Sequence, residues 1–313
     1  MKNVFFAFSL LLFVSGCMSG QTKTVAARIA PTHSDSLQKI VDTAAQSVLE
    51  KFASKKLLTN ELAITVINLG DAQKPMQASF RGDVQIYPAS VIKLFYLVAA
   101  HRGMEDGKIQ DTPELRRGMR DMIVDSLNEA TGYIVDAITG TTSGPELPQK
   151  EIEEWWNKRN AANRYFTSLG YTNINVSKKP WCEGPYGRET QAIKLFEPKR
   201  NWLTTDATAR LLSEIATGKA VSQKHCDEMM ELLKRDPFSK GDSGDQAHAY
   251  TGASVPPGTK LWSKAGWTSE MRHDAAYVEL PNGAKFVVVI FTTNHANDHA
   301  IIPFAAKAVI DQM

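Results

Sequence analysis

Ser90 and Lys93 have the residue types and the spacing that nucleophilic chemistry needs. They lie three positions apart in YPASVIKLFYLVAA, residues 87–100, at the start of an apolar segment that predicts a buried helix. Side chains three apart on a helix share one face, so the amine can reach the hydroxyl. An amine whose pKa is lowered by burial can take the proton from a serine. Ser is also a preferred helix N-cap, and that structural role stays open for Ser90.

The S-x-x-K spacing proves little by itself. Ser36 and Lys39 repeat it in the segment 36–53, whose apolar positions follow the 3-4 spacing of an amphipathic surface helix. Other motifs must therefore distinguish Ser90 from an ordinary helix start.

Two later motifs carry further polar groups. Ser126 and Asn128 lie two apart in a turn before the helical pattern of residues 130–138. Lys264 and Gly266 lie at the end of a predicted strand. S-x-x-K, S-x-N and K-x-G thus follow one another along the chain, each where a helix, turn or strand can position it.

The elements around these motifs predict a mixed α/β (α+β) fold. Predicted strands cover residues 62–69, 76–81, 260–263, 273–280 and 284–293, and a final helix covers 297–312. The segment 90–235 is mostly helical in pattern. We therefore expect one antiparallel sheet built from both ends of the chain, flanked by terminal helices, with an inserted all-helical lobe.

With these motifs the sequence resembles the class A β-lactamases and the wider penicillin-recognising serine hydrolases. The resemblance covers residues 35–313, and it includes TTDATARLLSEIATGKAVS, residues 204–222, which is similar to the Thr-Thr helix of that family. It implies a β-lactamase/transpeptidase-like fold. It also implies that Ser90 is acylated, that Lys93 activates it or relays its proton, and that Ser126 passes a proton to the leaving nitrogen.

The resemblance also implies the groups that bind substrate. Asn128 would bind the amide side chain of the substrate, and Lys264 would hold its carboxylate. The backbone N–H groups of Ser90 and of Trp267, the residue after Gly266, would form the oxyanion hole.

Two positions of the motifs depart from the family pattern. Leu127 stands where Asp is usual, and Ala265 stands where a hydroxyl residue is usual. Arg272 is either a second partner for the carboxylate or a surface arginine.

The largest departure is the Ω-loop, within residues 140–202, which has no clear E-x-x-L-N motif for the Glu that activates the deacylating water. Glu197 has Asn201 at the right spacing, but Arg200 replaces the usual Leu. Glu183 is a second candidate. In a chain without an equivalent base, the acyl-enzyme would form, but water would release the acyl group from it only slowly.

The N-terminus predicts export. Lys2, an apolar run at residues 4–14 and Ser15-Gly16-Cys17 resemble a lipoprotein signal that ends at a lipidated Cys17. Residues 18–34 then predict a tether, and 35–313 the hydrolase domain. The expected location is the bacterial cell envelope, lipid-anchored and facing the periplasm; a soluble signal cleaved near Gly20 is the alternative.

Other classes of function receive less support. The net charge of +2 and the absence of a basic run argue against nucleic acid as a partner. G-x-S-x-G is absent, and His295 and His299 are interpreted as solvated helix-cap residues, so neither a metal nor a cofactor is expected. A disulfide between Cys182 and Cys226 stays open.

Three functional hypotheses remain. The first is a serine β-lactamase-type hydrolase that opens the β-lactam amide through an acyl-enzyme on Ser90. The second is a penicillin-binding D-Ala peptidase or esterase with slow deacylation, acting on peptidoglycan stem peptides. The third is a non-catalytic lipoprotein binding module.

Overall fold

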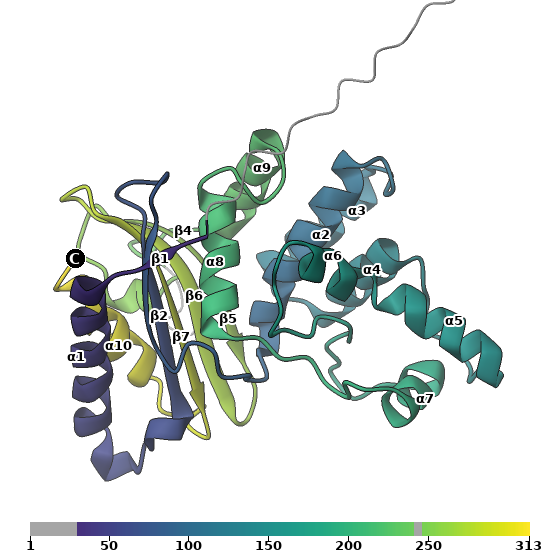
Figure 1. Cartoon of the computed structure of the whole chain (residues 1–313), viewed down its shortest axis with the longest axis horizontal. Helices are drawn as coiled ribbons and strands as arrows, with labels where there is room; N and C mark the ends of the chain where they lie inside the picture. Colours follow the sequence, from purple (N-terminus) through teal and green to yellow (C-terminus); the bar gives the residue numbers. More distant parts are fainter. Residues whose placement is uncertain (1–29, 241–245) are drawn as a thin grey trace, which may run out of the picture.

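The chain folds around one seven-stranded sheet with helices on both faces (Figure 1). The structure is a computed structural model that describes residues 30–240 and 246–313, so the predicted signal, Cys17 and most of the tether lie outside the described residues. The strands are β1 (Thr32–His33), β2 (Leu62–Asn68), β3 (Met76–Phe80), β4 (Lys234–Arg235), β5 (Lys260–Trp267), β6 (Met271–Glu279) and β7 (Lys285–Thr293).

The strand order confirms the prediction of one sheet from both ends of the chain. The order is β1-β3-β2-β7-β6-β5-β4, and the β2–β7 pair joins the two halves. All pairs are antiparallel except β1–β3. The short β1 strand lies inside the predicted tether, so the folded part begins slightly earlier than the expected residue 35.

The sheet separates two hydrophobic cores because side chains alternate along each strand. On β7, Val287 and Val289 pack into the core shared with the helical lobe. Val288 and Ile290 pack into the core under the terminal helices. The apolar run at residues 286–291 is therefore a strand buried on both faces.

Helices α1 (Asp35–Lys51) and α10 (Ile301–Ile310) cover the outer face, and α8 (Thr205–Ala216) packs on the inner face (Figure 1). These positions confirm the expected terminal helices. Ser36 and Lys39 lie exposed on α1, as a surface helix requires.

The helical lobe lies beside the inner face (Figure 1). It contains α2 (Lys93–Glu105), α3 (Pro113–Ile123), α4 (Asn128–Thr139), α5 (Gln149–Arg159), α6 (Ala161–Ser168), α7 (Gly187–Leu195) and α9 (Gln223–Leu233). Helix α2 is buried over its whole circumference from residue 93 to 101, so it forms the centre of the lobe.

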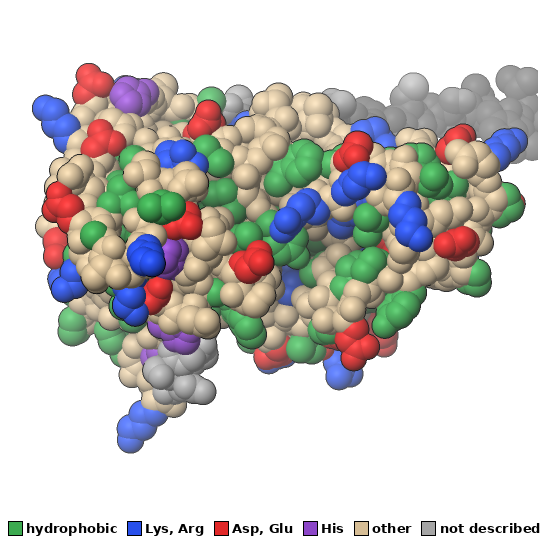
Figure 2. Space-filling model, turned by 90° about the horizontal axis from the view of Figure 1, so that it is seen from below, with side chains coloured by type: hydrophobic (Ala, Val, Ile, Leu, Met, Phe, Trp, Pro, Cys, Tyr) green, Lys and Arg blue, Asp and Glu red, His purple; other side chains and the backbone are tan. Residues whose placement is uncertain are grey.

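Four short 3-10 helices complete the described chain: η1 (Ala53–Lys55), η2 (Thr59–Glu61), η3 (Ala89–Ile92) and η4 (Thr251–Ser254). Acidic and basic side chains are interspersed on the face that Figure 2 shows. In the part of the chain that the structure describes, no helix combines the length and the apolar character that a membrane span requires.

His295 departs from the expectation of a solvated cap. Its side chain is buried, and its two ring nitrogens lie 2.8 Å from Oδ2 of Asp298 and 3.1 Å from Oε2 of Glu61. The two acidic partners explain the burial, because each ring nitrogen has a partner. His299 is exposed, as expected.

Candidate active site

Ser90 lies at the entrance of the buried helix and does not cap it. It belongs to η3, and the N-cap residues of η3 and α2 are Pro88 and Ile92, neither of which makes a side-chain cap. Ala89, just before the serine, has φ 46°, a left-handed conformation that costs a non-glycine residue free energy. The helix-cap interpretation of Ser90 is therefore wrong.

Lys93 is fully buried and brings two motifs together. Its Nζ lies 3.0 Å from Oγ of Ser90 and 3.2 Å from Oγ of Ser126. It also donates to the carbonyl oxygen of Ser126 at 2.5 Å and to Oδ1 of Asn128 at 3.0 Å. Burial lowers the pKa of Lys93 to about 8, although the charges of Cys182 and Glu129 act in the opposite direction.

These partners define the role that a neutral Lys93 can take. The carbonyl oxygen of Ser126 and Oδ1 of Asn128 can only accept, so they occupy the two N–H bonds of a neutral amine. The lone pair is then free to accept the hydroxyl proton of Ser90. This arrangement is the one that a general base for a serine nucleophile requires.

Ser126 lies between two lysines. Nζ of Lys264 donates to its Oγ at 2.9 Å, from β5 on the opposite side of the site. Ser126 has φ 57°, which turns the chain sharply before α4 and aims the hydroxyl at both amines. Burial holds the pKa of Lys264 well below its usual value, and the charge of Lys93 lowers it further.

Gly266 allows β5 to pass directly against the nucleophile turn. A Cβ at this position would lie 2.9 Å from the backbone nitrogen of Ser90 and 2.9 Å from the oxygen of Pro88. Only glycine permits this approach. It brings the chain segment of Trp267 next to Ser90, which is the placement that the predicted pair of oxyanion-hole N–H groups needs.

The structure thus brings Ser90, Lys93, Ser126, Asn128, Lys264 and Gly266 into one site. Ser90, Ser126 and Lys264 line a cavity of about 470 Å³, and so does Trp267, which is 69% exposed. Leu127, between Ser126 and Asn128, is 46% exposed.

Among the residues of this cavity that sequence reasoning missed, Gln246 and Arg235 act on Lys264. Oε1 of Gln246 accepts from Nζ of Lys264 at 2.8 Å and from the backbone N–H of Ala265 at 3.1 Å. Arg235, on β4, places its charge close enough to lower the pKa of Lys264. Neither residue belongs to a motif with fixed spacing, so their chain positions gave no signal.

Arg272 is buried, so the surface interpretation is wrong. Its guanidinium lies 4.1 Å from the ring centroid of Tyr250, and its Nη2 donates to the oxygen of Ala249. The ring of Tyr250 in turn lines the cavity.

The structure does not bring Glu197 to the serine. Its side chain is 74% exposed and its carboxylate lies 3.5 Å from Nζ of Lys199. Asn201 is buried and accepts from the backbone N–H groups of Ser177 and Lys178, so it holds the preceding loop in place. The geometry therefore gives no support to Glu197 as the base that activates water.

Cys182 occupies the space beside Asn128. Its Sγ donates a hydrogen bond to Oε1 of Glu129 at 3.3 Å and accepts one from Nδ2 of Asn128 at 3.6 Å. Glu183 is exposed and lines the same hollow. No disulfide joins Cys182, which is exposed, to Cys226, which is buried, so the open question of their pairing is answered in the negative.

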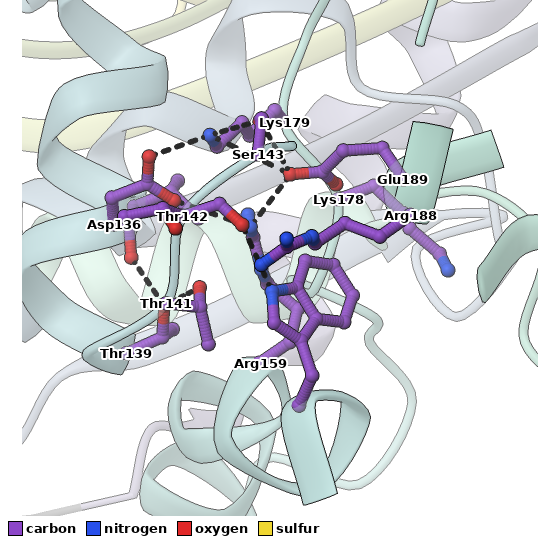
Figure 3. A network of polar contacts seen from close by, with 12 residues as sticks. Asp136, Thr139, Thr141, Thr142, Ser143, Arg159, Lys178, Lys179, Arg188 and Glu189 are labelled. Carbon is purple, nitrogen blue, oxygen red and sulfur yellow. Dashed lines mark hydrogen bonds and ion pairs between the residues drawn. The ribbon is translucent and has the colours of Figure 1, made fainter. Parts of the chain in front are cut away.

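A buried ionic network fixes the loop that carries Cys182 (Figure 3). Nζ of Lys179 lies 2.7 Å from Oδ2 of Asp136 on α4 and 3.5 Å from Oε1 of Glu189 on α7. Nη2 of Arg159 on α5 reaches the same Glu189 oxygen at 2.7 Å. These ion pairs between largely buried side chains join α4, α5 and α7 to the loop and hold the loop against α4.

The neighbouring tryptophans complete this packing. Trp155 is buried, and Trp156 stacks on Phe196 with centroids 5.4 Å apart. Nζ of Lys178 lies 3.9 Å from the centroid of Trp156. The pair is therefore part of the fold of the lobe.

The sequence model of the β-lactamase enzyme family matches residues 110–313, about two thirds of the chain, so the protein belongs to this family. The match contains Ser126, Asn128 and Lys264 and begins after Ser90 and Lys93. The chain is a serine β-lactamase-type hydrolase by this membership. No curated protein matches it in sequence.

Solved structures show the same fold. A β-lactamase from Sphaerobacter thermophilus is 20% identical with a TM-score of 0.61, covering 87% of this chain and 97% of its own. PBP-A is 18% identical with a TM-score of 0.61, and the match covers 91% of this chain and 98% of PBP-A. The TLA-3 extended-spectrum β-lactamase is 15% identical with a TM-score of 0.63, and the match covers 87% of this chain and 98% of TLA-3. These likenesses confirm the predicted fold class.

Proposed function

We propose that the protein opens the amide bond of β-lactams by acylation of Ser90. The observation that carries this proposal is the placement of Lys93, with its Nζ 3.0 Å from Oγ of Ser90 and two N–H bonds directed at the carbonyl oxygens of Ser126 and Asn128. Neutral Lys93 takes the proton of Ser90, and the freed oxygen attacks the lactam carbonyl carbon. The backbone N–H groups of Ser90 and Trp267 stabilise the negative oxygen that develops.

Ser126 completes the step. Its hydroxyl gives a proton to the lactam nitrogen as the carbon–nitrogen bond breaks, and it is reprotonated from Lys93, which lies 3.2 Å away. Lys264 and Arg235 provide positive charge for the carboxylate of the substrate, and Asn128 receives its amide side chain. The substrate is a small anionic amide.

A second function, that of a penicillin-binding D-Ala peptidase or esterase, is favoured by the position of Glu197. That carboxylate is 74% exposed, and the hydrogen bonds of Lys93 run to Ser90, Ser126 and Asn128, none of which is acidic. Water then attacks the acyl-enzyme without a carboxylate base, and the acyl group stays on Ser90 for longer. A solved structure of a PBP-A mutant, 18% identical to this chain, is an acyl-enzyme complex with penicillin G.

The test mixes the purified protein with a chromogenic cephalosporin and a fluorescent penicillin. Turnover that Ser90→Ala abolishes supports the hydrolase, and a stable adduct on Ser90 without turnover supports the peptidase. Glu197→Gln should change turnover less than about twofold, since an exposed carboxylate does not act on the acyl-enzyme. Absence of both adduct and turnover favours the non-catalytic binding module.

We also propose that the protein is exported and anchored to the bacterial envelope by lipid on Cys17, facing the periplasm, where it would meet β-lactams and contribute to antibiotic resistance. The residues concerned lie outside the described part, so the proposal rests on Lys2, the apolar run and Ser15-Gly16-Cys17. Mass spectrometry of the mature N-terminus tests it. Cys17→Ser should release the protein from the membrane fraction.

A further inference from the structure

A second cluster of polar side chains lies inside the helical lobe, where α2 packs on α9. It contains His101 of α2 together with His225 and Glu228, which lie one turn apart on α9. We propose that these three side chains bind one divalent transition-metal ion of the Zn²⁺ class. The site is separate from the serine, because His101 lies about 12 Å along α2 from Lys93.

The three ligand atoms are already at the right separations. The Nδ1 atoms of His101 and His225 lie 2.9 Å apart, and Oε2 of Glu228 lies 3.3 Å from Nδ1 of His225 and 3.7 Å from Nδ1 of His101. A circle through three atoms at these distances has a radius of about 1.9 Å, slightly less than the ~2.0–2.2 Å of zinc–nitrogen and zinc–oxygen bonds. One ion just outside their plane therefore contacts all three without movement of a side chain.

The orientation of His225 also suits a ligand. Its Nε2 lies 3.2 Å from Oε2 of Glu105, which also accepts from Oγ of Ser222 at 3.1 Å. A carboxylate can only accept, so it holds the ring proton on Nε2 and leaves a lone pair on Nδ1, toward His101. Metal-binding histidines commonly donate their other nitrogen to a carboxylate in this way.

Without an ion, the cluster leaves a carboxylate oxygen unsatisfied. Oε2 of Glu228 is buried without a hydrogen-bond partner. Nη1 of Arg116 lies 3.5 Å from Oε2 of Glu228, but Nε and Nη2 of that arginine donate to Asp111 at 2.7 Å each. The proton between the two Nδ1 atoms makes a hydrogen bond from one histidine to the other. Neither ring therefore donates to Oε2 of Glu228, and the free energy lost when this oxygen was removed from water is not recovered. A cation would remove that cost.

The ligand types select the kind of ion. Two imidazoles and one carboxylate suit Zn²⁺, Co²⁺, Ni²⁺ or Cu²⁺, whereas Mg²⁺ and Ca²⁺ prefer oxygen ligands. A fourth position remains for water, and the 26% exposure of the Glu228 side chain gives access to it. The ion would join the helix that carries Lys93 to α9, which leads directly into β4 at the edge of the active-site cavity.

This site was not expected from the sequence, which indicated no metal. His101 and His225 are separated by 124 positions, so no short spacing relates them. Only the packing of α2 on α9 brings the pair together.

The experiment uses the untagged protein after treatment with a chelator, titrated with Co²⁺ and separately with Zn²⁺. We expect one ion per chain, visible absorption bands of low-symmetry Co²⁺ that Zn²⁺ removes, and a melting temperature raised by on the order of 3 °C under excess Zn²⁺. Mg²⁺ should have no effect.

Glu228→Gln and His225→Gln should each abolish the Co²⁺ bands and the thermal shift, and His299→Ala, which removes an exposed histidine, should retain both. Two variants at different ligands guard against loss of folding in one of them, and circular dichroism checks each. Wild-type protein that binds no Co²⁺, or Glu228→Gln and His225→Gln that bind it as the wild type does, would overturn the proposal. The readouts do not depend on hydrolase activity, so they are independent of the proposed function.

Discussion

Gln246 accepts a hydrogen bond from Nζ of Lys264 at 2.8 Å, and this contact positions the lysine beside Ser126. The same Oε1 atom accepts from the backbone of β5, and Nε2 of Gln246 donates to the oxygen of Val124 at 3.0 Å. A single amide thus connects the strand of Lys264 to the turn of Ser126.

Replacement of this amide should slow acylation. In Gln246→Ala, Lys264 loses an acceptor and the link between β5 and the Ser126 turn, so we expect acylation to fall by about 10- to 100-fold, the equivalent of one hydrogen bond to a charged group. Stopped-flow acylation by a fluorescent penicillin measures it. Gln312→Ala, at the exposed C-terminus, is the matched control, and an unchanged rate in Gln246→Ala would contradict the positioning role.

Gly266→Ala should prevent acylation by steric overlap. Its Cβ would lie 2.9 Å from the backbone nitrogen of Ser90, so β5 and the nucleophile turn must separate. We expect at least about a 100-fold loss of acylation, because this separation displaces the oxyanion donors. Gly132→Ala is the control, since its Cβ would meet only Lys179, at 3.6 Å, and alanine suits the interior of α4. Normal acylation in Gly266→Ala would exclude the close approach.

The acylation rate should rise with pH through about 8. Burial lowers the pKa of Lys93 to about 8, and only the neutral amine can accept the proton of Ser90. The charge of Glu129 raises this pKa, so Glu129→Gln should move the midpoint to lower pH. Glu151→Gln, an exposed change on α5, should leave it in place. A midpoint that moves upward in Glu129→Gln would oppose this assignment.

The same burial predicts a change in stability with pH. Because the pKa of Lys93 is lower in the folded protein than its usual 10.5, the unfolded chain binds more protons between about pH 8 and 10.5. Stability should therefore rise with pH through this window, by about 1–2 kcal/mol from pH 8 to 9.5 for Lys93 alone. Denaturant unfolding at several pH values measures this rise in the free energy of unfolding. Lys93→Met should show a smaller rise than the wild type. An equal rise in both proteins would contradict the burial of a titrating amine at position 93.

Cys182→Glu should accelerate deacylation. The thiol lies 3.6 Å from Nδ2 of Asn128, so a carboxylate there would reach the region of Lys93 and could orient water toward the acyl group. We expect at least about a tenfold faster release of penicillin, a modest part of what a well-placed base provides. Cys182→Gln has the same shape without the charge and should not accelerate release. Equal rates of penicillin release in the two variants would show that a side chain at position 182 does not reach the acyl group on Ser90.

The fold was predictable because its elements have clear local patterns. The strands near Leu62 and Lys285 are β-branched and bounded by turns, and helix α1 has a regular apolar face, so each was recognised with bounds close to those observed. Strand β1 was missed because two residues with exposed side chains carry no periodicity.

The site was predictable only in part. Ser90, Ser126 and Lys264 belong to short motifs, and the structure brings these motifs together; their chemical roles stay predictions. Gln246 and Cys182 reach the site through tertiary packing, which leaves no trace in spacing. For Glu197 the spacing to Asn201 was misleading, because that carboxylate points to solvent.

The pairing of β2 with β7 has a consequence for biosynthesis. Residues 62–68 pair with residues 286–292, so strand β2 has no partner on one edge until residue 292 has been made. Contacts so distant in sequence form slowly. The turn of Ser90 packs on β5 and β6, which come equally late, so the nascent chain should be inactive, and its unpaired β2 edge should need protection from aggregation until the C-terminal strands arrive.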